Sequence, residues 1–277
     1  MGCCDSKDMK DVVKEKYGQI AVSQELGCGC GCGCSDDSGM DYSVFKEEYD
    51  GIAGYVPEAD LNLGCGLPTE YAGIKAGDTV IDLGSGAGND CFIASRIVGT
   101  NGEVIGVDMT PQMIDRAKAN AEKLEYTNVI FRLGDIENLP ITANKADVVV
   151  SNCVINLVPD KYLAFHEILR VLKPGGHFCI SDVVTEGHIP PSLLEQAELY
   201  AGCIVGALPV DQYLDIIAKS GFKKVVIHKK KPIDIPESLL NEFLSADEVK
   251  SFRDSGVGLF SITVTGEKPA CLCGCNC

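Results

Sequence analysis

From residue 78 to residue 182 the chain alternates short runs rich in valine and isoleucine with longer amphipathic stretches. The apolar runs are Thr79–Leu83, Glu103–Asp108, Asn128–Leu133, Ala146–Ser151 and His177–Asp182. The amphipathic stretches between them are Cys91–Val98, Pro111–Leu124 and Lys161–Leu172, and a Pro-Gly-Gly turn at 174–176 ends the last one. Apolar strands joined by helical crossovers predict an α/β fold, a parallel sheet covered by helices on both faces.

The pattern continues more loosely on both sides of this region. After Ser192 we expect two more helices and two strands, 223–228 and 258–265, the last of them antiparallel because a long helical excursion precedes it. Residues 6–22 predict an amphipathic helix capped by Ser6, with an apolar stripe of Val12, Val13, Tyr17 and Ile20. A second helix is expected over 42–55. We therefore divide the chain into a helical and cysteine-rich extension (1–70), a main domain (71–267) and a cysteine-rich tail (268–277).

Composition narrows the classes of function. The net charge of −16 argues against nucleic acid, whose recognition depends on Lys and Arg neutralising phosphates. No run reaches the roughly 18 apolar residues of a membrane span, and the first residues lack the apolar core of a secretion signal. Fifteen cysteines without such a signal predict a reducing cytoplasm, where thiols bind metals or do redox chemistry.

A glycine-rich turn follows the first strand and opens the first crossover helix. Its sequence is Asp82-Leu83-Gly84-Ser85-Gly86-Ala87-Gly88, and Asp108 ends the next strand. Glycines let the backbone approach a ligand closely, and an acid at the second strand end can accept hydrogen bonds from both ribose hydroxyls. Asp82 would repel a phosphate but suits an ammonium group. The combination favours a phosphate-free cofactor with a ribose, S-adenosylmethionine.

The loop after the third strand, Gly134-Asp135-Ile136-Glu137, offers an acid that could reach the adenine amino group, although a solvated loop acid is equally consistent. Together DLGSGAG, GVDMT, GDIENLP and RVLKPGG resemble the class I S-adenosylmethionine-dependent methyltransferases over roughly residues 70–267. The resemblance implies a Rossmann-like, doubly wound sheet of seven strands with an antiparallel final strand. It extends the predicted cofactor-binding set, which becomes Asp82, Gly84, Ser85, Gly86, Gly88, Asp108, Met109, Asp135, Ile136 and Asn152.

Three of the cysteines outside the alternating tracts Cys28–Cys34 and Cys271–Cys277 are candidates for the chemistry. Cys153 ends the fourth strand, beside the glycine loop in the usual strand order, whereas Cys65 and Cys203 lie in irregular, glycine-flanked segments. Singly, a buried cysteine is often a packing residue, which is our interpretation of Cys91 and Cys179 and an alternative for Cys153. Three thiolates beside a methyl sulfonium suit trivalent arsenic, a soft ion with three sulfur ligands and a lone pair. The lone pair can attack the methyl group without a general base.

The segments SNCVINLVPDK, NLGCG, GAGNDC and AGCIVGAL resemble the arsenite methyltransferases. This resemblance implies methylation of arsenite or methylarsenite, for detoxification, on three arsenic-binding thiols: Cys65, Cys153 and Cys203. It implies a relay thiol in the first tract, at Cys28, Cys30, Cys32 or Cys34, and disulfides that glutathione, its conjugates or thioredoxin reduce back to thiols. Leu63 stands where the family often has an aromatic residue, and the tail stands where larger relatives have another domain.

Two alternatives remain open. A methyltransferase acting on carbon or oxygen of a small molecule, such as a quinone, would share the cofactor motifs but would need a base near the methyl group. None of the four histidines, His166, His177, His188 and His228, is well placed by the pattern, although His188 in its loop could serve as a base or could be a surface residue. A soft-metal-binding protein would use the C-x-C-x-C-x-C tracts, although a metal buffer has no need of Asp82 or Asp108.

Overall fold

The computed structural model describes most of the chain between residues 6 and 270. The residues with a described placement are 6–23, 49, 51–61, 63–187, 189, 204, 206–235, 237, 240–241, 245, 247, 249–250, 253 and 255–270. The predicted arsenic-binding Cys203 and both cysteine tracts, 28–34 and 271–277, lie outside these residues. No helix among the described residues combines the length and the apolar character needed to cross a membrane.

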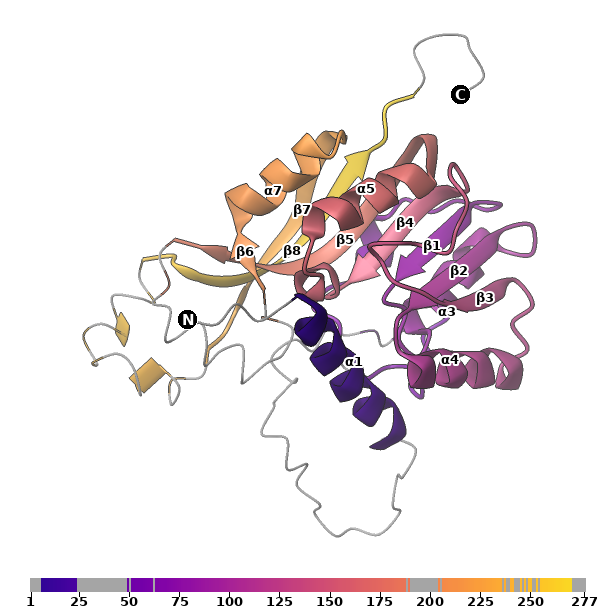
Figure 1. Cartoon of the computed structure of the whole chain (residues 1–277), viewed down its shortest axis with the longest axis horizontal. Helices are drawn as coiled ribbons and strands as arrows, with labels where there is room; N and C mark the ends of the chain where they lie inside the picture. The colour runs from indigo at the N-terminus through magenta and orange to yellow at the C-terminus, as the bar shows by residue number, and fades with distance from the viewer. Residues whose placement is uncertain are drawn as a thin grey trace.

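One sheet forms the centre of the molecule (Figure 1). Its strands are β1 Thr79–Leu83, β2 Glu103–Asp108, β3 Val129–Leu133, β4 Ala146–Asn152, β5 Leu172–Glu186, β6 Leu208–Pro209, β7 Lys223–Ile233 and β8 Gly258–Glu267. The order is β3-β2-β1-β4-β5-β8-β7, and β6 pairs with β5 outside this path. β1 to β5 are parallel, whereas β8 is antiparallel to both β5 and β7. The predicted doubly wound sheet with its antiparallel final strand is confirmed, and the short β6 adds an eighth strand.

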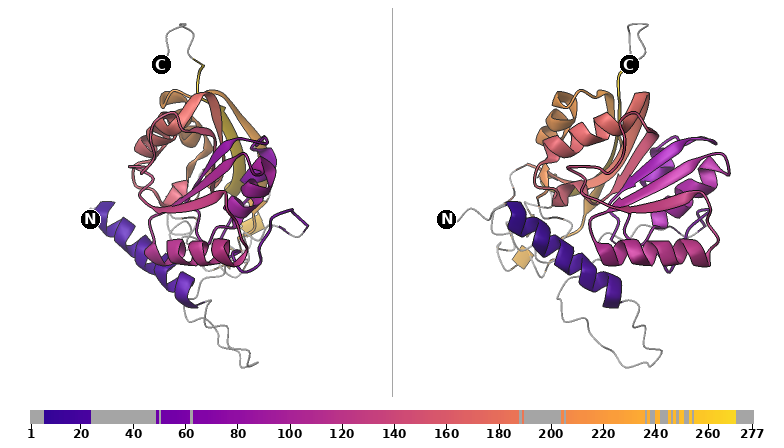
Figure 2. Two further views of the ribbon diagram at one scale, coloured as in Figure 1. Left: turned by 90° about the vertical axis from the view of Figure 1, so that its right-hand side faces the viewer. Right: turned by 45° about the vertical axis from the view of Figure 1, so that its right-hand side comes forward.

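Helices cover both faces of this sheet (Figure 2). On one face lie α3 Asn89–Val98 and α4 Pro111–Lys123, and on the other lie α5 Lys161–Val171 and α7 Val210–Lys219. Each face has its own apolar core, and neighbouring residues of β1 contribute to different cores. Val80 packs on the α3 side and Ile81 on the α5 side. Burial on both faces explains why the central strands β1, β2 and β4 are mostly apolar. A short helix not expected from the sequence, α2 Pro68–Tyr71, precedes β1.

Two strands are longer than predicted. The expected strand 177–182 extends over the whole of Leu172–Glu186, because the Pro-Gly-Gly turn lies within it as an irregularity in the pairing with β4. The helix before it still ends at Val171, close to the predicted stop. β7 continues to Ile233, so the basic run Lys229–Lys231 lies inside an edge strand and does not mark its end. Most other predicted bounds agree with the structure to within two residues.

The N-terminal helix α1, Ser6–Ser23, packs against α4 (Figures 1 and 2). Val13 and Ala21 are buried there, and Arg116 Nη1 of α4 donates a hydrogen bond of 3.1 Å to the carbonyl oxygen of Ala21. Val12, which we predicted in the apolar stripe, is 64% exposed, so that assignment was wrong. Consecutive residues of an α-helix point about 100° apart, so Val13 is buried while its neighbour Val12 is exposed.

The predicted helix 42–55 is also wrong where the structure describes it. Tyr49 and residues 51–55 form successive turns, in which Ile52 N donates to Tyr49 O and Tyr55 N donates to Ile52 O. Gly51 and Gly54 have φ angles of +85° and +96°. These left-handed conformations interrupt a right-handed helix, and glycine adopts them at little cost. Tyr49 and Ile52, whose three-residue spacing suggested a helix, instead pack together within these turns.

Candidate functional site

The glycine-rich segment turns the chain from β1 into α3. Gly84 has a φ of +67°, and a Cβ at this position would lie 2.4 Å from Val154 Cγ2, so a side chain has no room. The amide nitrogens of Gly84 and Ser85 donate to the carbonyl oxygen of Val107 on β2, at 2.8 and 3.1 Å. Gly88 is the N-cap residue of α3. The loop is thereby fixed against the second strand, with its backbone at the carboxyl ends of β1 and β2.

Asp108 lies where the prediction placed it, at the end of β2. Its Oδ2 accepts a hydrogen bond of 3.0 Å from Gly86 N, and its Oδ1 accepts one of 2.8 Å from Thr110 N. Burial raises the pKa of this carboxyl, and the hydrogen bonds from Thr110 and Gly86 oppose that effect. The carboxylate is therefore held against the glycine loop by backbone amides.

Two further carboxylates are buried next to the loop. Burial and, secondarily, the charge of Asp90 raise the pKa of Asp82 well above its usual value. Burial raises the pKa of Asp90 to about 6, although hydrogen bonds from Asn152 and Tyr49 lower it. Cys91 Sγ donates to Asp82 Oδ2 at 3.2 Å, and no ion pair to Asp82 or Asp90 occurs within the described part of the chain. A cation placed between these acids would relieve their mutual repulsion.

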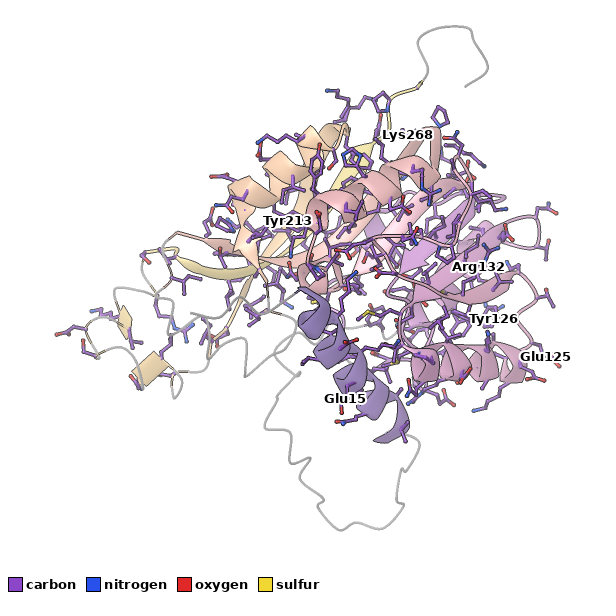
Figure 3. The ribbon with its side chains drawn as sticks, viewed as in Figure 1. Glu15, Glu125, Tyr126, Arg132, Tyr213 and Lys268 are labelled. Carbon is purple, nitrogen blue, oxygen red and sulfur yellow. The ribbon has the colours of Figure 1, made fainter. Side chains whose placement is uncertain are left out.

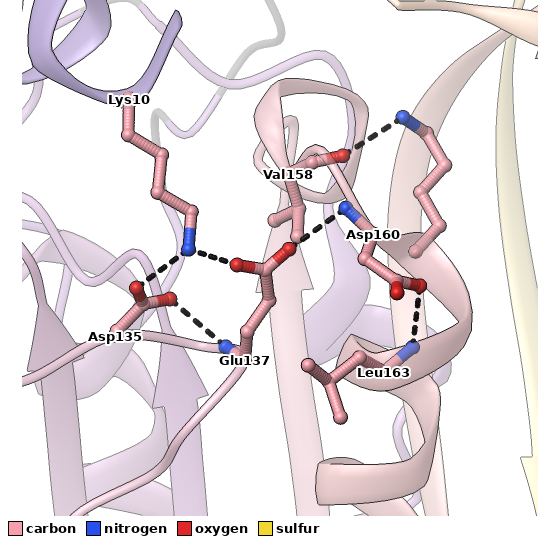
Figure 4. Close-up of polar contacts among 7 residues, drawn as sticks. Lys10, Asp135, Glu137, Val158, Asp160 and Leu163 are labelled. Atoms are coloured by element: carbon pink, nitrogen blue, oxygen red, sulfur yellow. Dashed lines mark hydrogen bonds and ion pairs between the residues drawn. The ribbon is translucent and has the colours of Figure 1, made fainter. Parts of the chain in front are cut away.

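Asp135 follows β3 in a loop that α1 covers. Lys10 of α1 forms an ion pair of 2.7 Å with Asp135 Oδ2 and a second ion pair with Glu137 (Figure 4). Glu137 also accepts a hydrogen bond of 2.7 Å from Asp160 N, at the start of α5. The predicted adenine acceptor is thus in contact with a lysine from a helix that the sequence did not place here.

The acids surround one cavity at the carboxyl edge of the sheet. Of the predicted cofactor residues, those that line it are Asp82, Gly84, Ser85, Gly86, Asp108, Met109, Asp135, Ile136 and Asn152, whereas Gly88 does not. Sequence reasoning missed other parts of the wall, among them Lys10, Val13 and Tyr17 of α1, Tyr49, Asp60 and Leu61 of the following segment, and Asp90. Asp90 could have been noticed in GAGNDC, but an acid in the first turn of a helix is common for electrostatic reasons alone.

The donor set of the cavity fits S-adenosylmethionine. Five carboxylates line it, Asp60, Asp82, Asp90, Asp108 and Asp135, and they suit a ligand that carries an ammonium and a sulfonium. Apolar side chains such as Met113, Ile136 and Leu157 share the wall and suit a planar base. Gly84 lies so close to Val154 that no side chain fits at this position, and the glycine loop therefore presents only backbone to the cavity here.

Two of the three predicted arsenic ligands lie together. Cys153 follows β4, lines the cavity and has a φ of +59°, and its amide nitrogen donates to Ser181 O at 2.8 Å. Cys65 belongs to the same buried apolar cluster as Cys153, and both are 2% exposed. Ile204, the residue after Cys203, is buried in this cluster too. Cys203 itself and the predicted relay thiols lie outside the described residues.

Asn152 connects the two cysteine segments. Its Oδ1 accepts hydrogen bonds from Cys65 N at 3.0 Å and from Gly66 N at 3.3 Å. Its Nδ2 donates to Gly66 O at 2.8 Å, to the hydroxyl of Tyr49 at 2.8 Å and to Asp90 Oδ2 at 3.1 Å. We predicted a cofactor-binding role for Asn152, and its amide group contacts protein atoms on both sides.

The remaining described cysteines and histidines do not line the cavity, although Cys91 donates to its carboxylate Asp82. Cys91 and Cys179 carry free thiols in the core on the α3 side of the sheet, as the sequence analysis expected. His166, His177 and His228 do not line the cavity, and His188 lies outside the described residues. His177 Nε2 is instead in contact with Ala72 O. Within the described part of the chain no three His, Cys, Asp or Glu side chains form a metal site.

Comparison with known proteins agrees with the geometry. Residues 74–244 match the family described as "Methyltransferase domain". The chain is 40% identical over 275 residues to the arsenite methyltransferase of Halobacterium salinarum. The aligned segment covers 96% of this chain and 68% of that protein. It is 37% identical over 215 residues to the arsenite methyltransferase of Aquipseudomonas alcaligenes, covering 75% of this chain and 60% of the relative.

A solved structure extends this result. The arsenic(III) S-adenosylmethionine methyltransferase of Chlamydomonas reinhardtii has a TM-score of 0.59 and 33% identity, over 74% of this chain and 67% of that one. Sequence, fold and cavity therefore agree, and the chain belongs to the arsenite methyltransferase family of S-adenosylmethionine-dependent methyltransferases.

Proposed function

We propose that this protein transfers a methyl group from S-adenosylmethionine to trivalent arsenic held by Cys65, Cys153 and Cys203. The observation that carries the proposal is the convergence of Cys65 and Cys153 in one buried cluster beside the acidic cavity. Ile204 in the same cluster supports Cys203 as the third ligand. A soft ion prefers thiolates to oxygen ligands, which favours arsenite or methylarsenite over a harder substrate.

The residues of the site divide the work between binding and orientation. When bound, S-adenosylmethionine supplies a methyl group on a sulfonium, which the lone pair of trivalent arsenic can take up as the arsenic is oxidised. Asp82, Asp90 and Asp108 would hold the cationic and ribose parts of the ligand. The buried thiols would fix the arsenic against the cavity wall at Cys153, so orientation supplies much of the rate. Because the lone pair carries no proton, no general base is needed.

Each methyl transfer oxidises the arsenic. Two electrons must then be supplied to restore the trivalent state. We propose that two cysteine thiolates supply them and form a disulfide, and that a thiol among Cys28, Cys30, Cys32 and Cys34 relays it outward. Glutathione or thioredoxin would then reduce the disulfide. Removal of inorganic arsenic in this way would serve detoxification in the cytoplasm.

The decisive experiment combines purified protein with arsenite, S-adenosylmethionine and either glutathione or the thioredoxin system. We expect methylated arsenicals by chromatography with elemental detection. Cys65→Ser, Cys153→Ser and Cys203→Ser should abolish them while calorimetry still shows cofactor binding. Cys179→Ser, a buried thiol in the core outside the cavity, is the matched control and should retain activity.

Three results would contradict the proposal. One is the absence of methylated arsenic with cofactor bound. Another is full activity in any of the three ligand variants. Methylation of a quinol in place of arsenite would establish the carbon- or oxygen-methylating alternative, and stoichiometric binding of soft metals without turnover would establish a metal-binding protein.

A further inference from the structure

Asn152 is the physical link between the cofactor cavity and the segment that carries Cys65. Each polar atom of its carboxamide has more than one partner. Oδ1 accepts from two backbone amides of that segment, and Nδ2 donates to Gly66 O of the same segment and to Tyr49 and Asp90 on the other side. The segment approaches so closely that a Cβ at Gly64 would lie 2.7 Å from Asn152 Nδ2. Because Asn152 directly precedes Cys153, one side chain determines how the two thiol segments meet.

The acceptor at the far end of this link is a cavity carboxylate. Asp90 Oδ2 accepts from Asn152 Nδ2 at 3.1 Å, and Asp90 Oδ1 is 3.4 Å from the hydroxyl of Tyr49. The hydroxyl of Tyr49 also reaches Gly66 O at 3.3 Å, so it contacts the thiol segment as well. Asp90 is 9% exposed and lines the cavity near Asp82, and the two acids repel each other. Neither has an ion-pair partner among the described residues.

A cationic ligand in the cavity would change the state of Asp90. It would supply the missing countercharge and favour the ionised carboxylate. A charged acceptor forms a stronger hydrogen bond than a neutral one, so the Asn152 amide would be held more firmly. Its Oδ1 would then remain directed at Cys65 N and Gly66 N. The network thus connects the charge of the ligand to the position of an arsenic-binding thiol.

We propose that Asn152 and Asp90 couple the two binding events, so that a cation in the cofactor cavity raises the affinity of the thiol site for trivalent arsenic. Asn152 and Asp90 are positioning residues in this scheme, because neither contacts arsenic. By linkage, arsenite must raise the affinity for the cationic ligand by the same factor. The inference depends on the proposed function, since it assumes that Cys65 binds arsenic.

The test measures arsenite affinity at about pH 5, where Asp90 is protonated in the empty cavity because burial raises its pKa to about 6. Equilibrium dialysis with elemental detection is carried out with and without saturating sinefungin. Sinefungin carries an amine in place of the methyl sulfonium, so it supplies the charge without a reaction. We expect it to lower the dissociation constant of arsenite by about five- to tenfold in the wild type, as is typical of coupled sites. Asp90→Asn and Asn152→Ala should reduce this factor to below about twofold. Circular dichroism should show that both variants are folded.

Ser261→Ala is the matched control. The Ser261 hydroxyl donates to Cys65 O from β8, so it supports the same segment without contacting the cavity. This variant should weaken arsenite binding equally with and without sinefungin and leave the coupling factor intact. Gly64→Ala provides a second disruption, because its Cβ displaces the Asn152 amide without removing it. It should lose the coupling as Asn152→Ala does.

The possible outcomes distinguish failure of the coupling from failure of the proposed function. Wild-type protein that methylates arsenite but binds it equally with and without sinefungin overturns the coupling and leaves the proposed function standing. Retention of the full factor in Asp90→Asn or Asn152→Ala overturns it as well. Failure of the wild type to bind arsenite at all overturns both.

Discussion

The hydroxyl of Tyr213 donates a hydrogen bond of 3.1 Å to Oδ2 of Asp182, and both residues are fully buried. Tyr213 lies on α7, between that helix and the sheet (Figure 3), and Asp182 lies near the carboxyl end of β5. Asp182 also accepts from Val183 N at 3.0 Å. Nearby, Asn156 Nδ2 donates to Val183 O at 2.8 Å, which fixes the loop between Cys153 and α5. The hydrogen bond from Asn156 therefore holds a loop whose neighbouring residues Val154 and Leu157 line the cavity.

Asp182 should make stability depend on pH. Burial raises its pKa from 3.8 to about 7, against the opposing effect of the Lys161 charge. The folded state therefore holds this proton more tightly than the unfolded state, so stability is lost as pH rises from about 4 to about 7. The slope reaches about 1.4 kcal/mol per pH unit for one proton. Asp182→Asn should remove this contribution, which urea unfolding between pH 5 and 8 measures.

The comparison requires a control variant that also replaces a carboxylate by an amide, but at an exposed site. Asp215→Asn removes a carboxylate whose only described ion pair is an exposed one, with Lys219 on α7, and should leave the pH slope of the wild type. An unchanged slope in Asp182→Asn would show that this carboxyl does not carry the dependence. The slope is informative even if the variant is less stable overall, because it reports protons and not contacts.

Gly84→Ala should impair cofactor binding more than stability alone explains. The φ of +67° costs a residue with a Cβ about 1–2 kcal/mol, and the new Cβ would overlap Val154 on the cavity wall. We expect cofactor affinity to fall by at least about tenfold, a free-energy change of about 1.4 kcal/mol. Calorimetric titration with S-adenosylmethionine measures the loss.

Gly99 provides a matched control for the backbone effect. Its φ is +66°, almost the same as that of Gly84, but nothing lies within 4 Å of a Cβ at this position. Because its ψ of −169° also lies in a region that only glycine readily adopts, Gly99→Ala should lower stability by at least about 1–2 kcal/mol and leave cofactor affinity unchanged. Equal losses of affinity in the two variants would mean that the contact with Val154 is not what shapes the site.

The sheet and the cofactor loop could be predicted from sequence because their determinants are local. Each strand is a short apolar run, and Asp82, Gly84 and Asp108 lie at the ends of such runs. Parallel strands then bring those ends to one edge whatever the rest of the chain does. The same reasoning placed Cys153 beside the loop, since β1 and β4 are neighbours.

The rest of the site depends on contacts between segments far apart in sequence. Asn152 and Cys65 are separated by 87 positions, and no local pattern indicates that the side-chain amide of Asn152 accepts a hydrogen bond from Cys65 N. α1 was predicted as a helix, but its amphipathic pattern does not say that Lys10 reaches Asp135, 125 positions away. The helix expected over 42–55 failed for the opposite reason, because Gly51 and Gly54 outweighed the apolar periodicity.

Lys10→Met should raise affinity for the cofactor. Lys10 Nζ is 2.7 Å from Asp135 Oδ2, so it competes for the carboxylate that we propose as the adenine acceptor. Partly exposed ion pairs contribute about 0.2–1 kcal/mol, so removal should strengthen binding by at most about fivefold. α1 should remain in place through Val13, Ala21 and the bond from Arg116.

The matched control for Lys10 is on the same helix. Lys14 is exposed on α1, so Lys14→Met removes an equal charge without touching Asp135. It should leave the dissociation constant of S-adenosylmethionine unchanged. Weaker binding in Lys10→Met would instead mean that the lysine closes α1 over the ligand, and that Asp135 does not serve the adenine.

Affinity for a cationic ligand should rise with pH between 5 and 7. Burial raises the pKa of Asp90 to about 6 and that of Asp82 well above its usual value. Below about pH 6 Asp90 is protonated in the empty cavity, and a cation must expel the proton before it gains the charge. Each linked carboxyl can therefore change affinity by at most about tenfold per pH unit. Sinefungin binding, followed by calorimetry at pH 5, 6 and 7, measures the slope.

Two variants determine whether Asp90 carries this dependence. Asp90→Asn should bind sinefungin more weakly at pH 7 and with a flatter pH profile, because the titrating group is gone. Asp115→Asn removes an exposed carboxylate of α4 and should keep the profile of the wild type. Two buffers with different ionisation enthalpies would add a direct count, since binding at pH 6 must release protons from the wild type and fewer from Asp90→Asn. A steep profile that survives in Asp90→Asn would assign the proton to Asp82, whose pKa burial also raises.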